Sequence, residues 1–275
     1  MTDLSFGSSI NGLADHNEHD WIARFFLHGR FSTIRMCTCW FSPLDKVLDF
    51  LFLALKRRQR AKNWALFSSK IDDRLSKGDT SDHRSDLVSP VIGKLAESIE
   101  GSGNINERRI TKGELLSHSL ACVLANSQLT TGAMTSCMYL LLKNKKALNE
   151  LTNEIRKAFT SDDQIGVQST QSLVYLDAVL NETLRVHNPT PINLPRVVPR
   201  EGRVIDGVFV PGGTIVGINL HVIQTSHLYW FEPEKFHPER FLPHSDPRYN
   251  HLFNQDVKAA FMPFSTGPRN CIGAK

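Results

Sequence analysis

The sequence has no apolar run long enough to cross a bilayer, and no pair of cysteines at the spacing of a metal or disulfide motif. A spanning helix takes about 20 consecutive apolar residues, whereas the longest candidate, residues 47–55, is short and carries Asp49. The five cysteines are an odd number without a C-x-x-C pair: Cys37, Cys39, Cys122, Cys137 and Cys271. This pattern argues against a disulfide framework and a zinc site, and it favours a reducing compartment.

A strong charge of one sign is also lacking. Lysine and arginine number 32 against 28 acidic residues, which gives a net charge of +4 over 275 residues and no argument for a nucleic-acid partner. Basic residues gather at positions 56–62, where a solvated helix face is the favoured interpretation. The 41% of hydrophobic and 22% of charged residues indicate an ordinary globular protein.

One cysteine near the end of the sequence lies in a glycine-rich stretch. Cys271 stands between Gly267 and Gly273, with Arg269 two residues before it and Phe264 seven residues before it. Glycines at this spacing let backbone N–H groups approach one sulfur, which stabilises a thiolate over a thiol. A buried structural role is the usual interpretation of an isolated cysteine. Here, however, the pattern Phe-x-x-Gly-x-Arg-x-Cys-x-Gly fixes many positions in a short window.

This pattern resembles the haem-ligand loop of the cytochrome P450 family, the haem-thiolate monooxygenases. The resemblance implies that the cofactor is haem, iron protoporphyrin IX, with Cys271 as the axial thiolate ligand of its iron. It further implies that Arg269 pairs with a haem propionate and that Phe264 packs beside the sulfur. Gly267 and Gly273 would be steric necessities.

A second motif lies on a helix predicted over residues 173–185. Glu182 and Arg185 are three residues apart and can form an ion pair, which on its own indicates no more than a solvated surface pair. With Pro-x-Pro after it and Pro-Glu-Arg-Phe at 238–241, the helix resembles the family's Glu-x-x-Arg helix. The resemblance implies that Arg240 joins Glu182 and Arg185 in a buried brace on the proximal side of the haem.

Between these motifs, residues 194–198 and 207–216 are predicted to form short strands, the latter around the turn Pro211-Gly212-Gly213. By resemblance, Arg196 is a second partner for a haem propionate. The alternative is an ordinary arginine at the edge of a strand.

A long helix is expected from Thr111 to about Lys143. Thr111 and Glu114 form a capping-box signal at its start. In the family this helix crosses the oxygen-binding face of the haem and carries Ala-Gly-x-(Glu/Asp)-Thr, whose acid and alcohol relay protons. Ala125 matches the first position of that motif and is expected to lie against the haem.

The acid and alcohol positions of this motif hold Gln128 and Leu129. Glutamine donates and accepts hydrogen bonds but exchanges no proton at neutral pH, and leucine does neither. No catalytic residue is therefore assigned, and we expect impaired proton delivery unless substrate hydroxyls or ordered water replace the relay. Two alternatives stay open: an atypical reaction that does not hydroxylate, and a site that has decayed.

The resemblance covers the C-terminal half or so of the family and stops two residues after Gly273. A gene truncation, a split gene model and a genuine short product would all look like this. We expect a fold that is mainly α with a small β component, forming one partial cytochrome P450 domain over residues 1–275. Its parts would be substrate-entrance helices and a linker (1–90), a long central helix region (91–160), and the Glu-x-x-Arg helix, small β region and haem-ligand loop (161–275).

Likeness to fungal members implies a monooxygenase that oxidises a lipophilic small molecule in secondary-metabolite biosynthesis. Its co-reactants would be O2 and electrons from NADPH-cytochrome P450 reductase, at the cytosolic face of the endoplasmic reticulum, or in the cytoplasm if the truncation is genuine. Residues 30–43 resemble a segment over the substrate entrance that makes peripheral membrane contact, although core packing explains them equally well. The competing hypothesis is a catalytically inert remnant of the fold.

Overall fold

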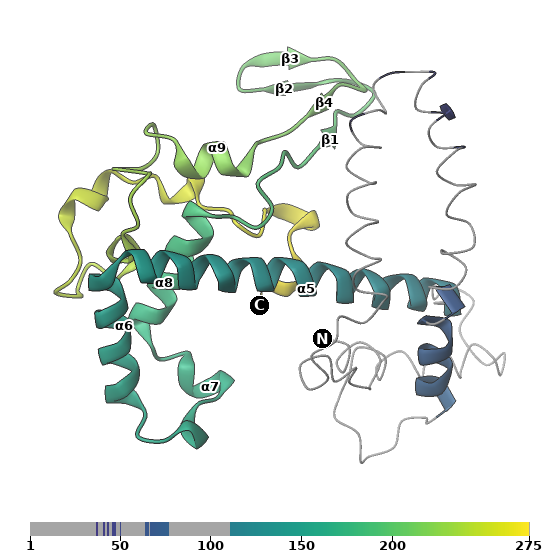
Figure 1. The fold of residues 1–275 in the computed structure, drawn as a ribbon. Coiled ribbons are helices and arrows are strands. Elements are labelled where there is room, and N and C mark those ends of the chain that lie inside the picture. Colours follow the sequence, from purple (N-terminus) through teal and green to yellow (C-terminus); the bar gives the residue numbers. More distant parts are fainter. Residues whose placement is uncertain are drawn as a thin grey trace, which may run out of the picture. The chain divides into compact units, whose positions relative to one another are not determined.

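The computed structural model describes residues 111–274 and, upstream, residues 64–65 and 67–76 with a few positions between 37 and 50. The chain divides into two compact units, Met1–Ser127 and Gln128–Lys275. The division falls within helix α5 (Lys112–Lys143), the longest helix drawn in Figure 1. Three expectations concern residues outside the described ones: those for the opening residues, the membrane-contact segment and the linker. The three-part division of the chain stays a prediction.

The described part of the first unit is a small helical core. Residues 67–76 are helical. Apolar side chains of this segment pack against the first half of α5, where the buried positions recur at helical spacing. The buried core residues are Phe67, Ile71, Leu115, Leu116 and Val123.

Helix α5 begins and ends at side-chain hydrogen bonds. At its start, the Thr111 backbone N–H donates to Glu114 Oε2 (2.9 Å), and the Glu114 N–H donates to Thr111 Oγ1 (3.2 Å). This reciprocal pair confirms the capping box read from the sequence. At the other end, Asn144 Nδ2 donates to the Leu140 carbonyl (2.7 Å), and the next helix, α6 (Lys145–Ala158), starts at the following residue.

The core of the second unit lies among the end of α5, helix α6, helix α8 (Val174–Val186) and the 3-10 helix η2 (Pro238–Phe241). Helix α8 matches the helix predicted over 173–185 within one residue at each end. Between α6 and α8 the chain forms the short helices η1 (Asp162–Gln164) and α7 (Val167–Thr170). The buried residues of this core are Cys137, Leu141, Ala147, Leu151, Tyr175, Ala178, Val179, Phe236, Leu242, Tyr249 and Phe253.

The strands form, but their pairing differs from the prediction. β1 (Arg196–Val197) pairs antiparallel with β4 (Ile215–Val216), and β2 (Arg203–Ile205) pairs antiparallel with β3 (Val208–Val210). The expected hairpin around residues 211–213 is wrong, because those residues connect two different ladders. The tight turn is Asp206-Gly207, whose φ angles of 48° and 77° suit a two-residue hairpin turn better than Pro-Gly-Gly does.

The rest of the second unit is a series of short helices. They are α9 (Leu220–Thr225), η3 (His251–Gln255), η4 (Lys258–Ala260), η5 (Gly267–Arg269) and η6 (Ile272–Ala274). A mainly helical chain with a few short antiparallel strands confirms the predicted fold class. Within the described residues, we find no helix with both the length and the apolar character to cross a membrane.

Candidate functional site

A buried ion-pair cluster joins helix α8 to η2. Arg185 Nε and Nη2 donate to the two carboxylate oxygens of Glu182 at 2.7 and 2.8 Å, and both side chains are fully buried. Arg240, also buried, places its Nε 3.1 Å from Glu182 Oε2. The structure therefore brings together the three residues that the sequence predicted as a brace, whose role toward a haem stays a prediction.

A fourth member of the cluster, Asp256, was missed by sequence reasoning. Its Oδ2 accepts from Arg240 Nη1 (2.7 Å), and its Oδ1 accepts from the backbone N–H of Phe231 (2.7 Å). Asp256 balances the second guanidinium, so that two buried cations meet two buried carboxylates. The predicted brace contained two buried arginines and only one glutamate, which leaves one positive charge uncompensated. This excess charge could have indicated that a second carboxylate was needed.

The guanidinium groups also organise the chain around them. Arg185 Nη1 donates to the carbonyl of Gln224 (2.8 Å), and its Nη2 donates to that of Lys235 (3.1 Å). The buried ring of Trp230 lies 5.3 Å from the Arg185 Cζ and 5.7 Å from the Arg240 Cζ. Planar, multiply hydrogen-bonded arginines in this arrangement fix three separate segments to α8.

Lys258 closes one side of the cluster. Its Nζ donates to the Arg240 carbonyl (2.6 Å) and lies 3.6 Å from Asp256 Oδ2. Burial lowers the pKa of Lys258 below its ordinary value, against the opposing attraction of Asp256. Lys258 thus lies at the partly exposed edge of the cluster.

The cysteine loop is held in shape by its own backbone. The N–H of Cys271 donates to the Phe264 carbonyl (2.9 Å), and the N–H of Asn270 donates to the Gly267 carbonyl (3.0 Å). Ser265 and Gly267 adopt positive φ angles of 61° and 79°. At its end the loop presents the free, exposed thiol of Cys271, which is available to a metal ion.

The two glycines of this loop differ in what they require. At Gly267 the positive φ favours glycine, although a Cβ would meet nothing within 4 Å. At Gly273 a Cβ would lie 3.8 Å from Cys271 Sγ, an ordinary contact. Within the chain, crowding occurs at neither glycine, and only the Gly267 backbone favours glycine. The expectation that both glycines are steric necessities of a haem-ligand loop stays a prediction.

The other predicted cofactor residues are exposed. Phe264 is 40% exposed, and Arg269 and Arg196 both lie at the surface, where Arg196 Nη1 donates to its neighbouring Pro195 carbonyl (2.9 Å). A free thiol suits haem iron, and exposed guanidinium groups suit its anionic propionates. The chemistry of this set therefore fits the predicted cofactor.

The predicted residues of α5 fall in different units. Ala125 is exposed in the first unit, and Gln128 and Leu129 are exposed in the second. Leu129 is 40% exposed. Neither position that the sequence compares with the proton relay carries an ionisable group.

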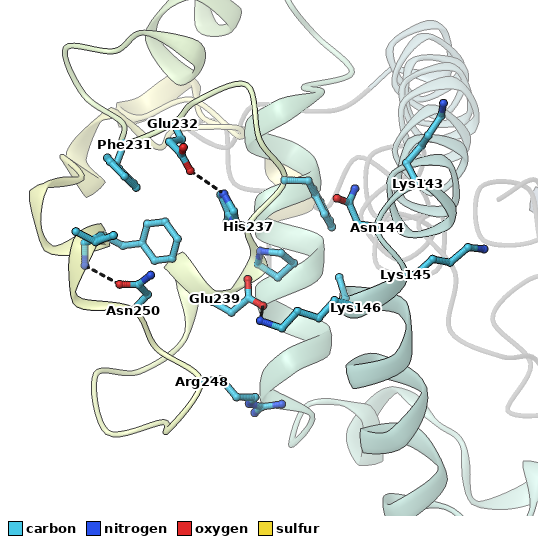
Figure 2. Close-up of a pocket in the computed structure, with 15 residues that line it drawn as sticks. Lys143, Asn144, Lys145, Lys146, Phe231, Glu232, His237, Glu239, Arg248 and Asn250 are labelled. Carbon is cyan, nitrogen blue, oxygen red and sulfur yellow. Dashed lines mark hydrogen bonds and ion pairs between the residues drawn. The ribbon is translucent and has the colours of Figure 1, made fainter.

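A separate pocket of about 710 Å3 lies where α5 meets α6, opposite residues 231–253 (Figure 2). Figure 2 shows Lys146 pointing toward Glu239, with Nζ 3.8 Å from Oε1, and His237 toward Glu232, with 3.3 Å between Nε2 and Oε2. None of the predicted cofactor residues lines this pocket. It is therefore distinct from the predicted haem site.

Comparison with known proteins identifies the chain's relatives. The family model described as Cytochrome P450 matches residues 2–275. Cytochrome P450 monooxygenase tpeC of Talaromyces stipitatus is 37% identical over 275 residues, 98% of this chain and 49% of that protein. Cytochrome P450 monooxygenase astD of Aspergillus oryzae is 34% identical over 273 residues, 99% of this chain and 50% of that protein. Averantin hydroxylase of Aspergillus parasiticus is 35% identical over 272 residues, 98% of this chain and 51% of that protein.

The chain spans about half the length of the curated relatives that it matches. Its mainly helical fold and its ion-pair cluster agree with the family that the cysteine pattern indicated. On the match of the family model over residues 2–275, this chain belongs to the cytochrome P450 family.

Proposed function

We propose that this chain binds haem through Cys271 and acts in a monooxygenase that oxidises a lipophilic small molecule. The observation that carries the proposal is the free, exposed thiol at the end of a backbone-fixed loop, in a chain of the cytochrome P450 family. Fungal relatives named as monooxygenases support the reaction, and secondary-metabolite biosynthesis is the pathway class that we propose.

When bound, the haem would supply the centre at which O2 is reduced with electrons from NADPH-cytochrome P450 reductase. Cys271 would hold the iron, and Phe264 would shield the sulfur from water. Arg269 and Arg196 would pair with the propionates, for which their exposed guanidinium groups are available. Small side chains such as Ala125 would let the flat group approach α5.

We propose that proton delivery is weak in this protein. Gln128 and Leu129 cannot pass protons toward the site, and Thr130 cannot simply take over, because one helical step turns a side chain by about 100°. Transfer would then depend on substrate hydroxyls or water. We expect the double variant Gln128→Glu with Leu129→Thr to improve proton delivery. With a lipophilic probe that gives a binding spectrum, the variant should release a smaller share of the NADPH electrons as peroxide than the wild type does. Thr130→Ala should leave that share unchanged.

For location, we propose the cytosolic face of the endoplasmic reticulum with peripheral membrane contact. A lipophilic substrate supports this placement, because such a molecule concentrates in the bilayer.

The test of haem binding is the carbon monoxide difference spectrum of the reduced 275-residue protein reconstituted with haem. A thiolate-type Soret band should be present in the wild type and in Cys122→Ala, a second free cysteine, and be lost in Cys271→Ala. A band that survives in Cys271→Ala, or no band in the wild type, would overturn the proposal and favour the inert remnant.

A further inference from the structure

Two buried amide side chains lie between the ion-pair cluster and the cysteine loop. Asn188 is 3% exposed and Gln224 is fully buried. Asn188 Nδ2 lies 3.3 Å from Gln224 Oε1 and 3.4 Å from the carbonyl of Pro263, and it donates to both. The Asn188 Oδ1 accepts from the backbone N–H of Thr190 (2.8 Å). Both ends of this amide are therefore used.

The contacts of Gln224 extend this connection into the cluster. Its backbone carbonyl accepts from Arg185 Nη1 (2.8 Å), and Arg185 is paired with Glu182 through two hydrogen bonds. Hydrogen bonds and the backbone of Gln224 thus connect the Glu182 carboxylate to the carbonyl of Pro263.

Pro263 is the residue from which the cysteine loop starts. The next residue, Phe264, offers the carbonyl that accepts the N–H of Cys271. Proline has no N–H, so its carbonyl is the only backbone group through which it can be held by a hydrogen bond. A donor to the Pro263 carbonyl therefore holds the segment whose next residue, Phe264, is hydrogen-bonded to Cys271.

Of the two polar atoms in the Gln224 side chain, only the acceptor Oε1 makes a hydrogen bond. Within the described residues, its Nε2 is the one buried side-chain nitrogen or oxygen without a hydrogen-bond partner. Leaving a buried donor unpaired destabilises a fold. An amide kept there is useful for its other end, Oε1, which holds Asn188.

We propose that Asn188 is a positioning residue, which holds the start of the cysteine loop through the Pro263 carbonyl and so sets the placement of Cys271. Gln224 orients the Asn188 amide, and Arg185 fixes the backbone of Gln224. The consequence for iron ligation rests on the proposed function, whereas the control of the loop concerns the chain alone.

The first test measures hydrogen exchange of the Cys271 amide in the haem-free 275-residue chain. Asn188→Asp keeps the acceptor for Thr190 and loses the donor to Pro263, so exchange at Cys271 should rise roughly tenfold, the effect of losing one hydrogen bond. Val179→Ala is the control, because Val179 is buried on α8, which ends two residues before Asn188, and it packs in the core of the second unit. The proposal is overturned if Asn188→Asp has no effect or if both variants raise exchange equally.

A second variant covers the case in which Asn188→Asp does not fold. Gln224→Leu fills a similar volume and removes both the unpaired Nε2 and the acceptor Oε1, while its backbone carbonyl still receives Arg185. It should fold and raise exchange at Cys271 severalfold, by less than Asn188→Asp. Unchanged exchange in this variant would also overturn the proposal.

The second readout is spectroscopic and uses the haem-reconstituted protein. At equal haem content, Asn188→Asp should lower the thiolate-type share of the carbon monoxide Soret band, and Val179→Ala should not. An unchanged share in Asn188→Asp would overturn the role in ligation. If the wild type shows no thiolate band, the proposed function fails, and hydrogen exchange still decides whether Asn188 holds the loop.

Discussion

Arg185 meets Glu182 through two hydrogen bonds, 2.7 and 2.8 Å long, with both side chains fully buried one helical turn apart on α8. The same carboxylate also accepts the backbone N–H of His237 (2.9 Å) and faces Arg240. This carboxylate therefore accepts hydrogen bonds from three residues, Arg185, His237 and Arg240. Such a cluster is costly to break, because removal of one charge leaves its partner buried and unpaired.

The first prediction concerns the charge of Glu182. Glu182→Gln keeps the size of the side chain but leaves the buried Arg185 without a carboxylate partner and leaves Arg240 paired with Asp256 alone. The free energy of unfolding should fall by about 3–5 kcal/mol. The measurement is urea denaturation followed by the fluorescence of Trp230, in a protein whose other three tryptophans have been replaced. Glu234→Gln, which breaks an exposed pair with His227, is the matched control and should leave the midpoint unchanged. A loss of less than about 1 kcal/mol in Glu182→Gln would contradict the prediction.

The second prediction concerns the shape of Arg240. Its Nε, Nη1 and Nη2 reach Glu182, Asp256 and the Phe231 carbonyl, respectively. Lysine keeps the charge but has one nitrogen, so Arg240→Lys should lower the free energy of unfolding by about 2 kcal/mol or more.

The control for this variant is Arg248→Lys. Like Arg240, Arg248 uses more than one nitrogen, with Nε donating to Asp246 Oδ1 (2.9 Å) and Nη2 to Oδ2 (2.7 Å), but its side chain is 31% exposed. Water can therefore donate to the Asp246 oxygens that lysine leaves without a partner, and the loss should be smaller. Equal losses of unfolding free energy in the two variants would show that burial of the guanidinium group does not determine the loss.

Features that depend on neighbouring residues were predictable from the sequence. The capping box at Thr111, the extent of α8 and the spacing of Glu182 and Arg185 all follow from local hydrogen bonding and helical periodicity. Arg240 was found because it lies in a recognisable run after the helix. These features need no knowledge of how distant segments pack.

Features set by long-range packing were missed. Asp256 and Asn188 stand in no motif, and each acquires its role only when segments far apart in the sequence meet. The strand pairing was wrong for a related reason. Arg203, at the start of β2, was not expected in a strand, so the stronger Asp-Gly turn at 206–207 was overlooked.

The third prediction concerns how α8 begins. Its N-cap residue, Leu173, has no side chain that can accept a hydrogen bond. Instead Glu154, on α6, accepts the N–H of Tyr175 at Oε1 (2.9 Å) and that of Leu176 at Oε2 (3.0 Å). Glu154→Ala should lower the free energy of unfolding by about 1–2 kcal/mol, since it removes both a cap and a negative charge at the helix N-terminus.

Two further variants define the cause of that loss. Glu154→Gln keeps one acceptor oxygen and should lose about half as much. Glu150→Ala changes a carboxylate on the same helix that lies 4.0 Å from Arg248, and it should have little effect. A loss in Glu150→Ala as large as that in Glu154→Ala would attribute the effect to helix charge rather than to capping.

The last prediction is a pH dependence centred on Tyr175, which is fully buried on α8. Burial, followed by the charge of Glu239 and the hydrogen bond to it (3.3 Å), raises the pKa of Tyr175 above its ordinary value of 10.0. The folded state therefore keeps the phenol proton at a pH where the unfolded chain has released it. This contribution to stability is complete below about pH 10 and is lost as the pH rises above it.

Tyr175→Phe removes the titrating group and should therefore flatten the decline. Between about pH 9 and pH 11, the free energy of unfolding should fall more steeply with pH in the wild type than in Tyr175→Phe, as measured by urea denaturation at each pH. Tyr139→Phe, which changes an exposed tyrosine on α5, should keep the wild-type slope. Parallel curves for wild type and Tyr175→Phe would mean that the unfolded and folded chains release this proton alike, which the burial of the ring beside Glu239 argues against.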